Sequence, residues 1–293
     1  MRESHYIHSS SGNKLHLLEF IPKSSFSKPI LFIHGAIENG TIFYSKGSKG
    51  LAPYLQECGF HCFVLDLRGR GNSTPALSRS SSFGQEEIIR EDFPRIIDYI
   101  RGMKKNLPLN FITHSWGGVL VNAFLLEFPT YKEYVGKMVH FAAKRHVAVM
   151  NPHRLFYIDF AWLILGSIIV KLWGYLPKNF FGPDGESAGT LKDSQKWIYS
   201  KEWTDSKAGI CYSSLAKESP LPQTLYLAGT KDFCLGHPSD VLRFALESGH
   251  SQQDVVVLGL SQGQIRDYDH ISLLTAKEAP KEHFQKVIAF FNL

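Results

Sequence analysis

Three side chains in this sequence have the residue types that nucleophilic acyl transfer needs. They are Ser115, Asp232 and His270, and they occur in that order along the chain. A serine hydroxyl is a weak nucleophile at neutral pH, so it needs a base that takes its proton. Histidine is the usual base, and a carboxylate holds it in the required tautomer. These residues predict a nucleophile, a base and an orienting acid if the fold brings them together.

Ser115 lies between two apolar segments of different kinds. The segment 109–113 is short enough for a buried strand, whereas the segment 119–128 stops before Pro129 and predicts a helix. A strand that becomes a helix within a few residues makes a tight, strained turn. The turn presents its serine as a nucleophile and points the following amides outward. The usual pattern is Gly-x-Ser-x-Gly, and here Thr113 replaces the first glycine.

Asp232 and His270 also follow predicted strands. Asp232 lies on a glycine-led loop after the apolar run 224–227, and His270 lies in the loop after the run 255–260. In open parallel sheets the reacting groups gather at the carboxyl ends of the strands. The order Ser, Asp, His is that of the α/β-hydrolase nucleophile-elbow motif.

Other acids are weaker candidates for orienting His270. Asp267 and Asp269 share its loop, and neighbours in a loop seldom have the orienting geometry, so Asp232 is preferred. After the predicted strand 135–141 the chain continues with Ala142, Ala143 and Lys144, which supply no carboxylate.

The elements that must position these residues alternate between strand and helix. A β-hairpin is expected in the first twenty residues, around Ser11-Gly12-Asn13. Strands are expected at 29–33, 60–67, 109–113, 135–141, 224–227 and 255–260, and helices at 48–58, 85–103, 119–128, 239–248 and 280–291. This alternation is typical of a parallel sheet covered by helices on both faces, so the predicted fold class is α/β.

One segment breaks the alternation. We expect residues 1–147 and 221–293 to form the core and residues 148–220 to form an inserted helical cap over the carboxyl edge of the sheet. The cap contains the uncharged run 160–170, which is too short to span a bilayer. Its many aromatic residues have three interpretations: packing of the cap, an apolar wall for a substrate, or weak contact with a membrane surface.

Five motifs make the chain resemble the α/β-hydrolase superfamily, in particular its lipase-like and esterase-like members. They are His34-Gly35, the turn Asp66-x-Arg68-Gly69-x-Gly71-x-Ser73, the Ser115 turn, the Asp232 loop and the His270 loop. Together they span nearly the whole sequence. The resemblance implies a doubly covered, mostly parallel sheet with a helical cap.

The resemblance also implies a reaction. It implies a serine hydrolase that cleaves a carboxylic ester with an apolar acyl group, with no cofactor and no metal. It places the oxyanion hole at the backbone N–H groups of Ala36 and Trp116. A serine at the turn counts against dehalogenase and epoxide-hydrolase chemistry, for which the family uses an aspartate. An acyltransferase, a thioesterase, a peptidase and a non-catalytic binding protein of the same fold remain alternatives.

The composition sets the remaining expectations. The 293 residues carry 44 % hydrophobic residues, 20 % charged residues and a formal charge of +5, which is an ordinary globular balance. The sequence has no basic stripe with interleaved aromatic residues, so we expect no nucleic-acid binding. The four cysteines form no CxxC pair, and the N-terminus lacks the apolar core of a signal peptide. We therefore expect a cytoplasmic protein without a transmembrane segment; the sequence does not indicate its oligomeric state.

Overall fold

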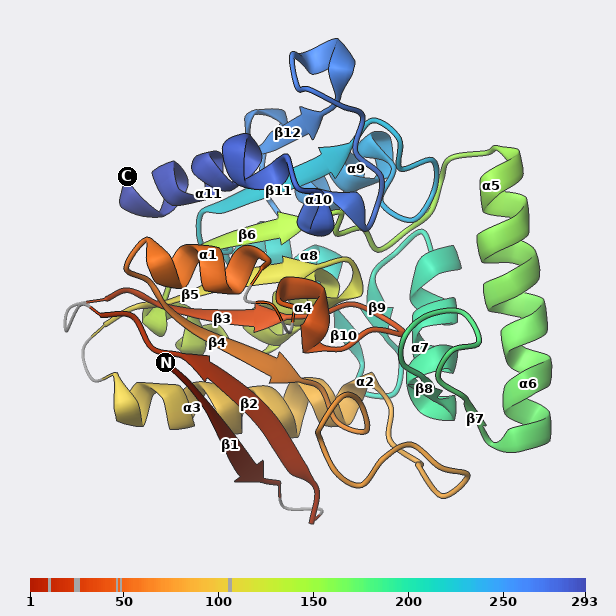
Figure 1. Ribbon diagram of the computed structural model, residues 1–293. Coiled ribbons are helices and arrows are strands. Elements are labelled where there is room, and N and C mark those ends of the chain that lie inside the picture. The colour runs from red at the N-terminus through yellow and green to blue at the C-terminus, as the bar shows by residue number, and fades with distance from the viewer. Residues whose placement is uncertain (10–11, 24–26, 46, 48, 105–106) are drawn as a thin grey trace.

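A twisted eight-stranded sheet is the centre of the molecule (Figure 1). The computed structural model describes residues 1–9, 12–23, 27–45, 47, 49–104 and 107–293. The strand order is β1-β2-β4-β3-β5-β6-β11-β12. β2 runs antiparallel to both β1 and β4, and all other neighbours are parallel. The predicted α/β fold class with a mostly parallel sheet is confirmed.

The strands of this sheet match the apolar runs of the sequence closely. They are β1 (Arg2–His8), β2 (Lys14–Phe20), β3 (Pro29–Ile33), β4 (His61–Asp66), β5 (Leu109–His114), β6 (Val135–Phe141), β11 (Thr224–Gly229) and β12 (Val255–Leu258). Every residue of β3, β4 and β5 is buried, as expected of strands covered on both faces. The predicted hairpin is β1 and β2, although Ser11 of its turn lies outside the described residues.

Helices cover both faces of the sheet. One face packs against α1 (Leu51–Glu57) and α11 (His283–Asn292), and the other packs against α3 (Phe93–Met103), α4 (Trp116–Glu127) and α9 (Pro238–Glu247). Smaller helical pieces are η1 (Gly40–Phe43), α2 (Gln85–Glu87), η2 (Ile88–Asp92), η3 (Pro129–Tyr134), η5 (Gln252–Asp254), η6 (Leu260–Gln262), α10 (Ser272–Thr275) and η7 (Ala279–Lys281).

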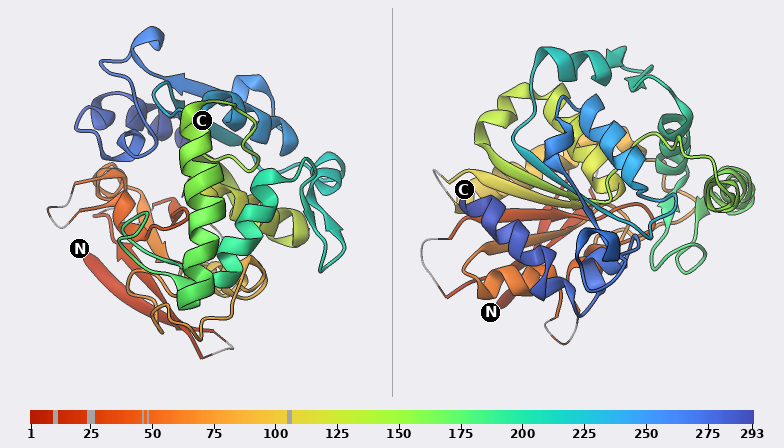
Figure 2. Two further views of the ribbon diagram at one scale, coloured as in Figure 1. Left: turned by 90° about the vertical axis from the view of Figure 1, so that its right-hand side faces the viewer. Right: turned by 90° about the horizontal axis from the view of Figure 1, so that it is seen from above.

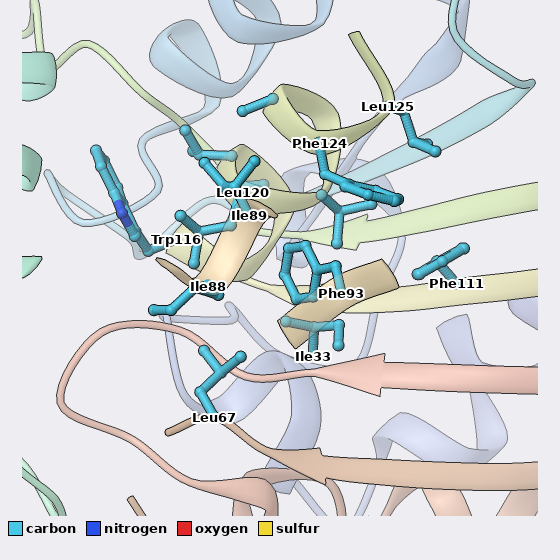
Figure 3. Close-up of a cluster of buried hydrophobic side chains, with 14 of the residues drawn as sticks. Ile33, Leu67, Ile88, Ile89, Phe93, Phe111, Trp116, Leu120, Phe124 and Leu125 are labelled. Atoms are coloured by element: carbon cyan, nitrogen blue, oxygen red, sulfur yellow. The ribbon is translucent and has the colours of Figure 1, made fainter. Parts of the chain in front are cut away.

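The helix α4 is apolar all round because it lies inside the protein. All of its residues from Trp116 to Leu126 are buried. Figure 3 shows its inner side chains, such as Leu120 and Phe124, packed against Ile88, Ile89 and Phe93. This packing fixes the start of α4, directly after the candidate nucleophile Ser115. The helix begins at Trp116, so the expected start at Val119 is three residues late.

The segment between β6 and β11 lies beside the carboxyl ends of the parallel strands (Figure 1). We call residues 148–220 the inserted segment. It contains α5 (Pro152–Arg154), η4 (Leu155–Leu165), α6 (Gly166–Trp173), α7 (Ala188–Tyr199) and α8 (Tyr212–Glu218). Two small two-stranded sheets join them, namely β7 (Tyr175–Leu176) with β8 (Glu186–Ser187) and β9 (Thr204–Asp205) with β10 (Ile210–Cys211).

The elements α5, η4 and α6 form one continuous helix, Pro152–Trp173 (Figure 2). It has 22 residues and a mean hydropathy of 1.9, which makes it long and apolar enough to cross a membrane by length and composition alone. The expectation concerned the uncharged run 160–170, which is itself too short for a bilayer, but that run is only part of the helix, which continues past Asp159 and Lys171 at its ends.

Candidate active site

The backbone at Ser115 has the strained conformation expected of a nucleophile turn. Its φ of 50° and ψ of −122° lie outside the regions that ordinary L-residues adopt. The Ser115 amide donates to the carbonyl of Phe141 at 2.8 Å, which ties the turn to the end of β6. A Cβ on Gly35 would approach the Ser115 Cβ to 2.8 Å, so the Gly35 loop can lie against the turn only as glycine.

Thr113 fits in place of the usual glycine because of its neighbours. Its hydroxyl donates to His140 Nδ1 at 2.7 Å, and His140 Nε2 in turn donates to Asn122 Oδ1 at 3.0 Å. Burial lowers the pKa of His140 to about 3, which keeps the ring neutral for this chain of hydrogen bonds. The opposite neighbour is Gly118, where a Cβ would lie 2.8 Å from Thr113 Oγ1. The branched side chain therefore takes space that Gly118 leaves free.

Asp232 and His270 form a buried hydrogen-bonded pair. His270 Nδ1 donates to Asp232 Oδ2 at 2.6 Å, and the Asp232 side chain is 2 % exposed. Burial alone would raise the pKa of Asp232. The charge and hydrogen bond of His270, the Gly236 amide and the charge of Lys144 outweigh burial and lower that pKa. Asp232 is therefore the carboxylate that the fold brings into hydrogen-bond contact with the His270 ring.

The other two aspartates of this region have structural partners instead. Asp267 accepts from Thr230 Oγ1 at 2.8 Å and from the Leu260 amide at 2.9 Å. Asp269 accepts from the amides of Ile271 and Ser272 at 3.1 and 2.8 Å. In the described part of the chain, the hydrogen bonds of His270 involve Nδ1 and its carbonyl oxygen, and none reaches Ser115 Oγ. In unliganded enzymes such catalytic hydrogen bonds are often long and tighten only when the substrate binds.

A second histidine–carboxylate pair lies directly beside the first. His114 Nδ1 donates to Glu38 Oε2 at 2.8 Å, and His114 Nε2 donates to the carbonyl oxygen of His270 at 3.0 Å. Since both ring nitrogens face acceptors, the doubly protonated ring satisfies both contacts. Although burial opposes it, Glu38 raises the pKa of His114. In the same way the charge of His114 outweighs burial and lowers the pKa of Glu38 to about 2.

This pair joins three loops of the site. Glu38 Oε2 also accepts from the Gly35 amide at 2.9 Å, so the carboxylate links the Gly35 loop to the turn before Ser115. His114 extends the link to the His270 loop, and the two histidine rings lie 4.7 Å apart. The sequence analysis did not identify Glu38, because nothing local in the loop 34–40 indicates that its carboxylate faces a histidine 76 residues away.

We expect the Glu38–His114 pair to make stability depend on pH. The lowered pKa of Glu38 contributes stability that is present above its ordinary pKa of 4.5 and is lost as pH falls towards 2. The raised pKa of His114 contributes stability that is present below 6.5 and is lost as pH rises through its folded value. Both contributions are fully present between pH 4.5 and pH 6.5. The difference in the free energy of unfolding between the wild type and Glu38→Gln, measured by urea unfolding, should therefore be largest in this range.

The control for this measurement is Glu57→Gln, which changes an exposed carboxylate at the end of α1. Its stability difference from the wild type should stay near zero across the same range. A Glu38→Gln difference that is constant with pH would contradict the ion pair.

A third buried pair connects the core to the inserted segment. Arg70 Nη2 donates to Glu186 Oε2 at 2.5 Å, and both side chains are at most 3 % exposed. Arg70 Nη1 also donates to the Gly35 carbonyl at 3.1 Å, and Glu186 Oε1 accepts from the Ile37 amide at 2.9 Å. The backbone on both sides of Ala36 is therefore held by this pair. Ile37 adopts a φ of 52°, a strained value that needs such support.

Ala36 and Trp116 both line one small cavity. Its volume is about 10 Å³, roughly the space of one water molecule. Ile88 and Leu120 contribute apolar walls, and the inserted segment closes the cavity with Glu186, Thr190 and Ser194. Two buried donors that line it, Arg70 Nε and Gln85 Nε2, have no hydrogen-bond partner among the described residues.

Removing the Glu186 carboxylate should destabilise the protein and slow its reaction together. In Glu186→Ala the Arg70 cation stays buried without its partner, and such changes typically cost about 3–5 kcal/mol. The Ile37 amide also loses its acceptor, so the backbone at Ala36 should lose its fixed position. We expect a lower melting temperature and a lower kcat.

A double variant separates the two effects. Arg70→Met combined with Glu186→Leu removes both charges, so it should recover part of the lost stability. It should not recover kcat, because the contacts to Gly35 and Ile37 remain absent. Glu202→Ala, which changes an exposed glutamate of the inserted segment, is the matched control. Wild-type kcat in Glu186→Ala would show that the pair does not position this loop.

One group of potential metal ligands lies outside this site. Ligand atoms of Glu3, His5 and Glu19 come within 4.8 Å of one another on β1 and β2. Two of these residues already pair, since His5 Nε2 lies 2.7 Å from Glu19 Oε2. His61 also contacts Glu19, at 2.5 Å.

Comparisons with known proteins agree with this architecture. Residues 28–164 match the family model described as the alpha/beta hydrolase fold. Sterol esterase 2 of Saccharomyces cerevisiae is 25 % identical over 140 residues, which cover 43 % of this chain but only 25 % of that protein. The matched part therefore spans about a quarter of this curated relative.

Solved structures resemble the chain over its whole length. A soluble variant of monoglyceride lipase from Saccharomyces cerevisiae has a TM-score of 0.67 at 14 % identity, covering 100 % of this chain and 94 % of that one. A thermophilic esterase from Thermogutta terrifontis has a TM-score of 0.60 at 15 % identity, covering 99 % and 98 %. The family match, the strand order and the shared fold show that the chain has the α/β-hydrolase fold and is similar to esterases and lipases of that fold.

Proposed function

We propose that this protein is a serine hydrolase that cleaves a carboxylic ester through an acyl-enzyme. The observation that carries the proposal is the buried 2.6 Å hydrogen bond between His270 and Asp232, on loops that follow β12 and β11. Ser115 is the nucleophile in this proposal, because it occupies the strained turn between β5 and α4.

The reaction has two steps. Ser115 Oγ attacks the ester carbonyl while His270 Nε2 takes the hydroxyl proton, and the alcohol then leaves with that proton. Water repeats the attack on the acyl-enzyme and releases the acid. Asp232 holds the His270 tautomer and stabilises the imidazolium. The amides of Ala36 and Trp116 donate to the oxyanion, and each such donor is worth about 3–4 kcal/mol in the transition state.

We propose an apolar acyl group because of the walls around the cavity that Ala36 and Trp116 line. Ile88 and Leu120 come from the core, and Trp197 of the inserted segment lies 6.2 Å from the Trp116 ring. An acyl chain needs far more than the space of one water molecule. We therefore propose that the inserted segment acts as a cap that moves when substrate binds.

Hydrolysis of p-nitrophenyl esters from acetate to palmitate tests the proposal. We expect kcat/KM to rise with acyl length and then to level off when the pocket is full. Turnover of thioesters or amides in preference to esters would favour the thioesterase or peptidase alternative, and product formation that requires an added alcohol would favour an acyltransferase. No turnover with any ester, thioester or amide would favour a non-catalytic binding protein.

A further inference from the structure

The helix Pro152–Trp173 presents an apolar face that the protein itself does not cover. We call this the outer face, and it consists of Phe156, Phe160, Leu163, Ile164, Ile168 and Leu172, which are 37 % to 63 % exposed. The opposite face carries Ile158, Trp162 and Ile169, which are buried in the core. Soluble monomers seldom expose a contiguous apolar patch along a whole helix, and such patches mark interaction sites.

The helix lies along the margin of the molecule. Figure 2 shows it at the front in one view and end-on at the edge in the other, with the rest of the inserted segment beside it. Its inner face is bonded to α7, because Trp162 Nε1 donates to Ser194 Oγ at 3.2 Å and Gln195 Nε2 donates to the Trp162 carbonyl at 2.7 Å. The helix therefore lies flat against the body, and its outer face is available along its full length.

The charges around the outer face are basic. Asp159 is the single acidic residue between positions 152 and 183 of the sequence. It pairs with Arg154 at 3.5 Å and accepts from the Tyr199 hydroxyl at 2.5 Å, so its charge is compensated. Lys171 and Lys178 are exposed near the C-terminal end of the helix, where Arg79 donates to the carbonyl of Leu172 at 2.5 Å.

We infer that the outer face docks on a lipid bilayer that carries anionic headgroups, with the helix lying in the plane of the interface. Apolar side chains along the helix and exposed lysines near its C-terminal end match the acyl region and the phosphates of such a surface. Trp173, 48 % exposed at the end of the helix, has the amphipathic ring that favours this depth. A second copy packed through the same face would bring the same lysines, and its Asp159 is already paired with Arg154.

The docked helix is also linked to the candidate site. Asn151 Nδ2 donates to the Phe233 carbonyl at 2.7 Å, and the His153 ring lies 4.7 Å from the Phe233 ring. Phe233 follows Asp232 directly, so the N-terminal end of the helix contacts the loop that carries the candidate acid. Docking would thus hold this loop close to the bilayer surface.

Flotation with vesicles measures the docking without any turnover. Wild-type protein should float with phosphatidylcholine vesicles that contain a quarter phosphatidylglycerol, and more weakly with phosphatidylcholine alone. The triple variant Phe156→Ser, Phe160→Ser, Ile164→Ser should need at least tenfold more lipid for half-maximal binding. Lys171→Glu combined with Lys178→Glu should remove the preference for phosphatidylglycerol.

The matched control replaces three apolar residues that are equally exposed elsewhere. Leu246→Ser, Leu260→Ser, Ile265→Ser changes side chains that are 54 % to 65 % exposed on α9 and after β12, and it should bind vesicles as the wild type does. Hydrolysis of p-nitrophenyl acetate by each variant shows that the fold is intact and, separately, whether the chain is an esterase.

Three outcomes would overturn the inference. They are failure of the wild type to float with either vesicle, equal binding by the outer-face variant, and a wild-type dimer that the outer-face variant dissociates while vesicle binding is absent. The last outcome would assign the face to a second copy. Vesicle binding without ester hydrolysis would contradict the proposed function and leave the docking intact.

Discussion

Ser115→Ala is expected to lower kcat for ester hydrolysis by about a millionfold, the size of effect that loss of a nucleophile has in other serine hydrolases. The hydroxyl forms the covalent bond to the acyl group, so no other group in the turn replaces it. Substrate binding should change little, because the cavity walls and the backbone donors remain. The measurement is steady-state hydrolysis of the best p-nitrophenyl ester, followed long enough to detect slow turnover.

The control for this variant is Ser80→Ala, which changes an exposed hydroxyl in the loop before α2. Its kcat should equal that of the wild type. If Ser115→Ala keeps its activity within tenfold of the wild type, Ser115 is not the nucleophile, and hydrolysis must depend on another group.

Asp232→Asn should lower kcat by about 10⁴-fold with little change in KM, the effect that the same substitution has in a serine-protease triad. The hydrogen bond to His270 Nδ1 is buried, so solvent does not replace the lost charge. An asparagine amide can donate to Nδ1 and hold the wrong tautomer, in which Nε2 carries the ring proton and has no lone pair to take the proton of Ser115. The shape of the pH profile of kcat should change in addition to its maximum value.

Asp269→Asn is the matched control, because this carboxylate lies next to His270 in sequence but accepts from the backbone amides of Ile271 and Ser272. We expect its kcat to stay within tenfold of the wild type. The opposite pattern, with a large loss in Asp269→Asn and a small one in Asp232→Asn, would reassign the orienting acid.

The parts of the fold that depend on local composition could be predicted from the sequence. The all-apolar run 29–33 predicts the limits of β3, because a strand buried on both faces has few polar residues within it, and the mainly apolar segment 135–141 predicts those of β6. The segment 85–103 is helical as expected, and Pro94 lies at the start of α3, directly after the wider turn η2. The sequence shows that Thr113 replaces the usual glycine, and the structure adds that Gly118 leaves room for its branched side chain.

Contacts between distant residues could not be predicted in this way. Glu38 meets His114 across 76 residues, and Arg70 meets Glu186 across 116 residues. No periodicity or motif encodes which buried charges will pair, because the pairing depends on how the loops at the carboxyl edge pack together. The two pairs nevertheless hold the backbone on which the oxyanion assignment of Ala36 depends.

The long surface helix was underestimated for a related reason. In the sequence Asp159 and Lys171 bound the uncharged run 160–170, as charges usually bound apolar segments. In the structure Asp159 pairs with Arg154 and accepts a hydrogen bond from the Tyr199 hydroxyl, and the helix continues on both sides of the run. Whether a charged residue ends an apolar helix depends on its partners in the folded structure, and these partners can be distant in the sequence.

Labelling with a fluorophosphonate probe tests the central claim most directly, because the probe reacts with an activated serine and not with an ordinary hydroxyl. We predict a single modified peptide that contains Ser115, with labelling slowed strongly in Asp232→Asn and absent in Ser115→Ala. Wild-type protein that remains unlabelled, or that is labelled equally after Ser115→Ala, would contradict the assignment of Ser115 as the nucleophile.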